Sequence, residues 1–208
     1  MNGWATTAVL AAASLLAACS RDEGPLADCQ LPSGATVLAI GDSLTRGFGA
    51  PGQGYVEQLH TLRPDLTVVN AGIDGERSDG LLARLDDALA EHRPAVVLIT
   101  SGGNDFLRRV PEADTRRHLA AVVDRVRAAG AWPVLFEMPR VSLTAAAGLL
   151  SAHALYADLA DDRGVHVIRG AVVDVLSDDA LKADAVHPNA RGYTVMAQAA
   201  QAVLGRCR

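Results

Sequence analysis

Short apolar runs alternate with longer amphipathic segments along most of this chain. Each apolar run is followed by glycine or polar residues, which is typical of buried strands. The runs predict strands at residues 37–40, 66–69, 95–100, 133–138 and 165–168. The segments between them carry apolar residues at helical spacing and predict helices at 54–62, 78–93, 111–129, 142–162 and 189–205. Ser78 is expected to cap the second helix. The pattern at residues 171–181 does not indicate one kind of secondary structure.

Alternating strands and helices predict an α/β fold, with a parallel sheet between two layers of helices. A length of 208 residues without an internal repeat or a second-domain boundary predicts one folded domain. In such a sheet the loops after the strands gather at one edge, where ligands bind. Polar clusters occur in these loops, so five residues can meet there: Ser43, Gly75, Asn104, Asp184 and His187.

The N-terminal segment does not resemble part of the fold. Residues 5–18 are apolar, but they are too few and too rich in Ala and Thr to span a membrane. The segment ends in Leu16-Ala17-Ala18-Cys19, which looks like a bacterial lipobox with a cysteine that is lipidated after cleavage. Simple secretion and an uncleaved anchor remain alternatives, because no Lys or Arg precedes the segment.

These signals divide the chain into three parts. We expect a lipoprotein signal peptide at 1–18, a lipidated N-terminus and tether at 19–34, and the folded domain at 35–208. Ser20 follows Cys19, and by resemblance to enterobacterial lipoproteins the lack of an aspartate in that position favours the outer membrane. The expected location is therefore the periplasmic face of the bacterial outer membrane, held by the lipid anchor.

Charge and cysteine content add two expectations. The net charge of −5 leaves no basic face, so nucleic acid is not an expected partner. Without Cys19, two cysteines remain, and an exported protein meets an oxidising compartment. Cys29 precedes the first strand and Cys207 follows the last helix, so both are expected at the same end of the sheet and can form a disulfide. Two free thiols near the termini are the alternative.

The polar edge can support nucleophilic catalysis. A serine hydroxyl needs a base to take its proton, and a histidine held by a carboxylate supplies one. Ser43 follows the first strand, and Asp184 lies three residues before His187 in a loop. The tetrahedral intermediate also needs hydrogen-bond donors, for which the Ser43 N–H, the Gly75 N–H and the Asn104 amide are candidates. Asp42 and Asp105 are interpreted as structural carboxylates.

Four short blocks in this order resemble those of the SGNH, or GDSL, hydrolase family. They are Gly-Asp-Ser-Leu at 41–44, the glycine-containing loop at 70–75, Gly-Gly-Asn-Asp at 102–105 and Asp-Ala-Val-His-Pro at 184–188. The chain looks most similar to bacterial arylesterase, thioesterase I and lysophospholipase members. The resemblance implies a three-layer, flavodoxin-like fold with strand order 2-1-3-4-5, and neither a cofactor nor a metal.

The resemblance assigns Ser43 as nucleophile, His187 as base and Asp184 as the residue that orients it, with Gly75 and Asn104 as oxyanion donors. Leu44, Phe106 and Leu107 are candidates for the acyl pocket, with loop packing as the alternative. The expected activity is hydrolysis of short- or medium-chain esters, aryl esters, thioesters or lysophospholipids by a monomer.

Three other functions remain open. A carbohydrate O-acetyl esterase would use the same residues. A metal-dependent phosphoesterase would need more histidines than the four blocks contain. A lipoprotein that keeps the fold as a catalytically silent binding module would need no nucleophile.

Overall fold

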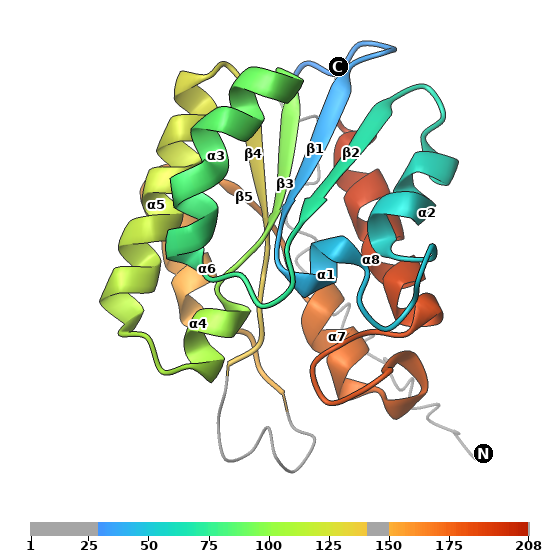
Figure 1. The fold of residues 1–208 in the computed structure, drawn as a ribbon, viewed down its shortest axis with the longest axis vertical. Helices are drawn as coiled ribbons and strands as arrows, with labels where there is room; N and C mark the ends of the chain where they lie inside the picture. The colour runs from blue at the N-terminus through green and yellow to red at the C-terminus, as the bar shows by residue number, and fades with distance from the viewer. Residues whose placement is uncertain (1–28, 141–149, 208) are drawn as a thin grey trace, which may run out of the picture.

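The computed structural model describes residues 29–140 and 150–207 (Figure 1). The expected signal peptide, the lipidation site Cys19 and most of the tether lie outside the described residues. Five parallel strands form one sheet in the order β2-β1-β3-β4-β5, which confirms the predicted topology. They are β1 (Thr36–Gly41), β2 (Thr67–Gly72), β3 (Val96–Thr100), β4 (Trp132–Phe136) and β5 (His166–Ile168).

Helices cover both faces of the sheet. Figure 1 shows α3, α5 and α6 on one face and α2, α7 and α8 on the other, whereas the short α1 and α4 lie at the carboxyl edge of the strands. The helices are α1 (Ser43–Arg46), α2 (Tyr55–Leu62), α3 (Ser78–His92), α4 (Gly103–Leu107), α5 (Glu112–Ala128), α6 (Ala154–Arg163), α7 (Ala171–Ser177), the 3-10 helix η2 (Asp179–Leu181) and α8 (Ala190–Leu204).

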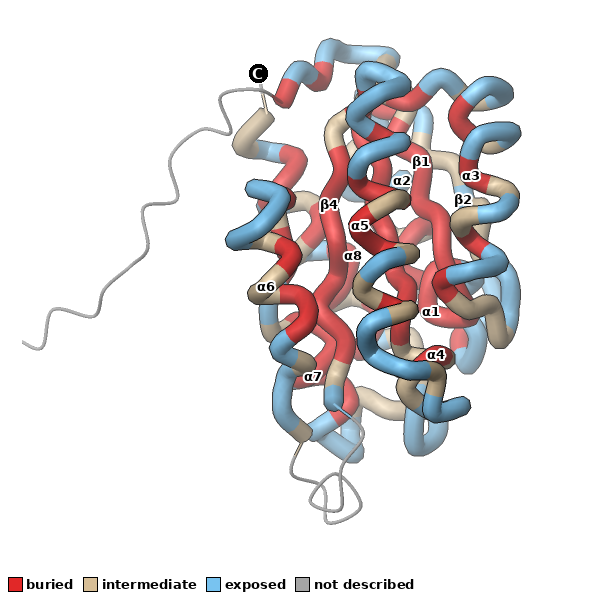
Figure 2. The backbone as a smooth tube through the Cα atoms, turned by 90° about the vertical axis from the view of Figure 1, so that its left-hand side faces the viewer, coloured by how far each residue is buried: buried red, intermediate tan, exposed pale blue. Residues whose placement is uncertain are grey.

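The core lies on both sides of the central strands. Every residue of β3 is buried, as expected for a parallel strand covered on both faces. Figure 2 shows its neighbours β1 and β4 buried along most of their length. The edge strand β2 is only partly covered, and its Asn70 is exposed. The continuous apolar runs of the sequence therefore correspond to the innermost strands.

Two local predictions were wrong. Strand β2 continues to Gly72, through residues 70–72 that were expected in a loop, because these residues pair with residues 39–41 of β1. Ser78 does not cap α3; it is the first helical residue, and its hydroxyl donates to Asp105 Oδ1 at 2.5 Å. In each case pairing with a distant segment overrides the local preference of a turn-forming or capping residue.

The segment before α6 also differs from the prediction of one helix over 142–162. Helix α6 begins at Ala154, after a backbone bridge between Pro139 and Ala152, and residues 141–149 lie outside the described part. The His153 ring nitrogen accepts the Leu155 N–H and caps the helix. Residues 171–181 form α7 and η2.

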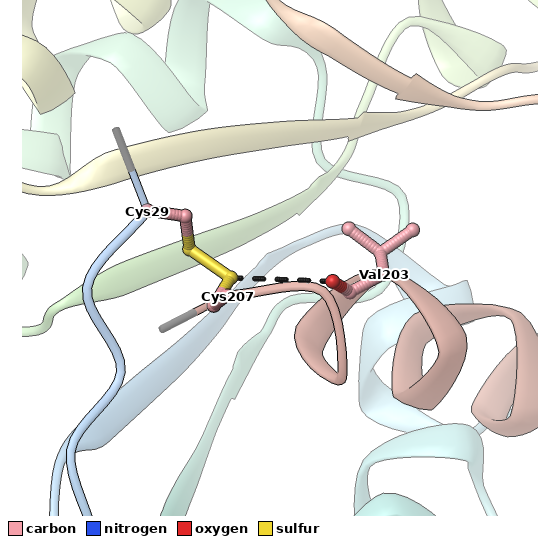
Figure 3. The surroundings of a disulfide bond; sticks show 3 residues. All are labelled: Cys29, Val203 and Cys207. Carbon is pink, nitrogen blue, oxygen red and sulfur yellow. Dashed lines mark hydrogen bonds between the residues drawn. A yellow bond between two sulfur atoms is a disulfide. The ribbon is translucent and has the colours of Figure 1, made fainter. Parts of the chain in front are cut away.

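A disulfide joins the two ends of the described chain (Figure 3). Cys29 and Cys207 are 178 positions apart in sequence, and their Cα atoms are 4.8 Å apart. Cys29 is fully buried and precedes β1, whereas Cys207 follows α8. The bond therefore lies at the amino end of the sheet, opposite the edge where the polar loops gather.

Candidate active site

Ser43 lies at a sharp turn between β1 and α1. At Gly41 the backbone has φ +154°, and a Cβ there would lie 2.0 Å from the Thr100 carbonyl oxygen. Only glycine therefore permits this close approach of β1 to β3. Asp42 caps α1 by accepting the Leu44 N–H at 3.0 Å. As the first residue of α1, Ser43 has an N–H with no partner inside the helix, so this donor can face a substrate.

The three residues expected to act on the ester form one hydrogen-bonded chain. Ser43 Oγ lies 2.9 Å from His187 Nε2, and His187 Nδ1 lies 2.8 Å from Asp184 Oδ2. Because Nδ1 must carry the proton to bond the carboxylate, Nε2 is the acceptor for the serine hydroxyl. Residues 144 positions apart in sequence thus meet with the geometry of a nucleophile and its base.

The loop that carries Asp184 holds its carboxylate in place. Asp184 Oδ1 accepts the backbone N–H groups of Val186 and His187, each at 2.9 Å. Partial burial opposes ionisation, but these hydrogen bonds and the His187 ring hold the pKa of Asp184 below its ordinary value. A carboxylate that stays ionised can keep His187 in one orientation and tautomer.

Phe48 is a site residue that the sequence did not reveal. Its ring packs against the His187 ring, with centroids 4.4 Å apart, and its carbonyl accepts the Tyr193 hydroxyl at 2.8 Å. Phe48 lies in the glycine-rich loop between α1 and α2 and remains 44% exposed. An aromatic residue in such a loop gives no local signal that it contacts a histidine 139 positions later.

The expected oxyanion donors face the same cavity as Ser43. Gly75 has φ +72° in a turn between β2 and α3, and Asn104 lies on α4. Both residues line the cavity together with Ser43 and His187. The Asn104 amide also donates to Asp42 Oδ2 at 3.3 Å. The three residues that carry the candidate donors therefore line one cavity, from α1, α4 and the turn before α3.

Asp42 is a buried carboxyl beneath this site, with 3% of its surface exposed. Burial raises its pKa to about 7, although hydrogen bonds from the Leu44 N–H and the Asn104 amide partly offset this effect. Its contacts go to the backbone and to side chains that shape the site. They agree with a structural carboxylate and not with a nucleophile.

A cavity of about 340 Å³ opens beside Ser43. Of the three candidates for the acyl pocket, Leu44 and Leu107 line this cavity and Phe106 does not, so the alternative of loop packing describes Phe106. The Phe106 ring instead stacks on His153, with centroids 4.0 Å apart. The wall also contains buried apolar residues that the sequence did not single out: Met138, Val172 and Leu176.

Two negative findings concern the described residues alone. Residues 29–140 and 150–207 contain no group of three or more His, Cys, Asp and Glu side chains placed to hold a metal ion. Within the same ranges, every helix is too short or too polar to cross a bilayer.

Curated proteins with a similar sequence include esterases and a thioesterase. Residues 39–195 match the model of the GDSL-like lipase/acylhydrolase family. Esterase TesA of Pseudomonas aeruginosa is 41% identical over 107 residues, which are 49% of this chain and 53% of that protein. Thioesterase 1/protease 1/lysophospholipase L1 of Escherichia coli K12 is 31% identical over 157 residues, which are 74% of this chain and 76% of that protein. The first match thus spans about half the length of the Pseudomonas esterase.

Solved structures share the fold over most of the chain. A crystal structure of TesA has a TM-score of 0.72 at 29% identity and covers 81% of this chain and 97% of that chain. The psychrotrophic esterase EstA from Pseudoalteromonas, inhibited by monoethylphosphonate, has a TM-score of 0.72 at 27% identity and covers 83% of this chain and 97% of that chain. An acetylxylan esterase mutant from Geobacillus stearothermophilus, at 22% identity, shares the fold with a TM-score of 0.67.

Proposed function

This chain belongs to the GDSL-like lipase/acylhydrolase family, and we propose that it hydrolyses carboxylic esters through an acyl-Ser43 intermediate. The observation that carries the proposal is the continuous hydrogen-bonded chain from Ser43 through His187 to Asp184, at the wall of an apolar cavity. Such a chain activates a hydroxyl that is otherwise a weak nucleophile.

The first half of the reaction transfers the acyl group to the protein. His187 Nε2 takes the Ser43 proton while Oγ attacks the ester carbonyl carbon. The carbonyl oxygen becomes an oxyanion, which the Ser43 N–H, the Gly75 N–H and the Asn104 amide stabilise. His187 then returns its proton to the leaving alkoxide, which departs as the alcohol.

The second half regenerates the serine. His187 takes a proton from water as the water oxygen attacks the acyl-Ser43 carbonyl carbon. The second oxyanion collapses, Ser43 Oγ leaves and recovers the proton from His187, and the carboxylic acid is released. Throughout both halves Asp184 holds the His187 Nδ1–H and stabilises the imidazolium that forms.

The cavity supports a substrate with a short or medium acyl chain. Its wall contains the apolar side chains of Leu44, Leu107, Met138, Val172 and Leu176, and its volume of about 340 Å³ exceeds what an acetyl group fills. We propose alkyl and aryl esters of such acids as substrates. Thioesters and lysophospholipids offer the same acyl carbonyl, and the name of the similar Escherichia coli protein, thioesterase 1/protease 1/lysophospholipase L1, supports their inclusion.

The alternatives make different predictions in one experiment. A panel of p-nitrophenyl esters from acetate to palmitate is assayed with the parent, with Ser43→Ala, and with Ser33→Ala as an exposed serine control. We expect hydrolysis that Ser43→Ala abolishes and Ser33→Ala retains, with an optimum beyond acetate. Activity on acetate alone would favour a carbohydrate O-acetyl esterase.

The remaining outcomes test the other classes. Activity that Ser43→Ala retains and a chelator abolishes would refute the serine mechanism and favour a metal-dependent phosphoesterase. A folded parent that hydrolyses no ester and resists fluorophosphonate labelling would identify a catalytically silent binding module.

We further propose that the protein is exported as a monomer and anchored through lipid on Cys19, facing the periplasm from the outer membrane. The lipobox-like Leu16-Ala17-Ala18-Cys19 supports the anchor, and the disulfide supports an oxidising compartment. Metabolic labelling with radioactive palmitate, compared between the parent and Cys19→Ser, tests the anchor. Membrane fractionation tests the location, and sedimentation in detergent tests the monomer.

A further inference from the structure

The two oxyanion donors that lie outside α1 belong to segments with no shared backbone hydrogen bonds. Asn104 is on α4, which follows β3, whereas Gly75 is in the turn that follows the edge strand β2 (Figure 1). We call residues 73–76 the Gly75 turn, which the hydrogen bond from the Glu76 N–H to the Ile73 carbonyl closes at 3.2 Å. Strand β1 lies between β2 and β3 in the sheet, so the two segments do not follow neighbouring strands, and side-chain contacts between them add to what the sheet fixes.

Arg108 makes the direct connection between these segments. It directly follows α4, and its Nη1 donates to the Gly75 carbonyl oxygen at 2.8 Å. The guanidinium also packs on the bare Cα of Gly75, because a Cβ there would lie 3.2 Å from Arg108 Nη2. The exposed Arg108 side chain thus links α4, which carries Asn104, to Gly75, whose N–H is the other candidate donor.

Two further contacts lie beside the turn, and one of them also joins α4 to the start of α3. Arg46, the last residue of α1, pairs with Asp74 at 2.6 Å and ties the turn to the helix that begins with Ser43. Deeper in the fold, the Ser78 N–H and hydroxyl both donate to Asp105. The Ser78–Asp105 contact is buried, so its loss affects folding, whereas Arg108 is exposed.

We propose that Arg108 is a positioning residue for ester hydrolysis, which ties the Gly75 turn to α4 and holds two oxyanion donors at a fixed separation. The inference rests on the proposed function. Arg108 acts through Gly75 and does not itself contact the reacting atoms.

This role has a signature that separates it from a role in stability. Hydrogen bonds to the oxyanion matter only when the charge has developed, so a displaced donor lowers kcat and leaves KM almost unchanged. An exposed arginine contributes little to folding. Loss of Arg108 is therefore expected to slow catalysis without a matching loss of stability.

The test compares the parent, Arg108→Ala, Arg108→Lys and the matched control Arg109→Ala in the purified full chain. Arg109 is the exposed neighbour, so its loss removes the same charge from the same region. We measure kcat and KM for p-nitrophenyl butyrate, inhibition by a boronic acid that forms a tetrahedral adduct on serine, and the Tm.

For Arg108→Ala we expect kcat to fall about 10-fold, which is less than the 10²- to 10³-fold loss when a donor is removed outright. KM should change less than about twofold, boronate binding should weaken by the same factor as kcat, and Tm should stay within about 3 °C of the parent. Arg108→Lys should recover part of the rate, because an ammonium can donate to the Gly75 carbonyl without the flat packing of a guanidinium. Arg109→Ala should match the parent.

Three results would overturn the inference. They are equal kcat in Arg108→Ala and Arg109→Ala, a kcat loss with unchanged boronate affinity, and a kcat loss that only follows a fall in Tm. Failure of the proposed function is distinguishable, because it would appear as esterase activity that persists in Ser43→Ala. If no tested ester is hydrolysed, the rate of fluorophosphonate labelling at Ser43 replaces kcat and must fall in Arg108→Ala alone.

Discussion

Replacing Asp42 with asparagine should change how the stability of the protein depends on pH. Asp42 is buried beneath the proposed nucleophile, and this burial raises its pKa to about 7 from an ordinary value of 3.8. Between these two pH values the native protein keeps a proton that the unfolded chain has released. Asparagine has nearly the same shape and carries no titratable group, so the variant lacks this dependence.

The size of the effect follows from the width of that window. A raised native pKa contributes stability that is fully present below pH 3.8 and is lost as the pH rises through 7. Each pH unit inside the window corresponds to about 1.4 kcal/mol, so a window of about 3 units corresponds to about 4 kcal/mol. Asp42 is almost completely buried, so solvent does not screen this effect.

Urea denaturation at pH values from 4 to 8 measures the effect. We expect the free energy of unfolding of the parent, relative to Asp42→Asn, to fall by about 4 kcal/mol over this range. Asp184 and the other carboxyl groups titrate in both proteins and cancel in the difference. Asp87→Asn, at an exposed position on α3, is the control. Its free energy of unfolding should depend on pH in the same way as that of the parent. Parallel curves for the parent and Asp42→Asn would refute the assignment of a raised pKa to Asp42.

Three further predictions concern the site and the disulfide. Asp184→Asn should lower kcat by about 10³- to 10⁴-fold in the p-nitrophenyl butyrate assay, because an amide no longer holds the required His187 tautomer; a loss below tenfold would contradict this role. Phe48→Ala removes the ring beside His187 and should lower kcat by about 2- to 12-fold, the equivalent of an aromatic contact of about 0.5–1.5 kcal/mol, and an unchanged kcat would exclude the contact from catalysis. Replacing Cys29 and Cys207 together with alanine should reduce the free energy of unfolding by about 5 kcal/mol, because the bond closes a loop of 178 residues. Urea denaturation of the oxidised parent, the reduced parent and this double variant separates the stability that comes from the S–S bond from the effect of replacing the two side chains. Equal free energies of unfolding of the two parent forms would contradict the prediction.

The sequence allows the parallel sheet and the meeting of Ser43, Asp184 and His187 to be anticipated for physical reasons, whereas the strand order is implied by the family resemblance. A continuous apolar run such as residues 95–100 has few alternatives to a buried central strand, and parallel strands bring the following loops to one edge. The four short blocks then identify which polar residues at that edge act together.

Other features depend on contacts between segments that carry no local pattern. Ser78 has the appearance of a helix cap, but its backbone N–H and its hydroxyl both donate to Asp105, 27 positions later. In the sequence Arg108 has no feature that distinguishes it from a solvent-exposed arginine, and its contact with the Gly75 carbonyl is visible only in the folded structure. Phe106 follows the oxyanion asparagine, yet its ring stacks on His153 from the loop before α6. These outcomes depend on tertiary packing, which spacing along the chain does not encode.

The position of the disulfide also has a consequence for the timing of folding during export. The bond joins the two ends of the described chain, so it can form only after synthesis has passed Cys207 and the chain has left a reducing compartment. The stability it adds, about 5 kcal/mol, is comparable to the whole stability of many domains. For a chain exported as proposed, the precursor in the cytosol lacks this contribution and stays closer to the unfolded state that translocation requires. Oxidation after translocation then stabilises β1 and α8, the first and last elements of the fold, and completes the esterase on the side of the membrane where it is proposed to act.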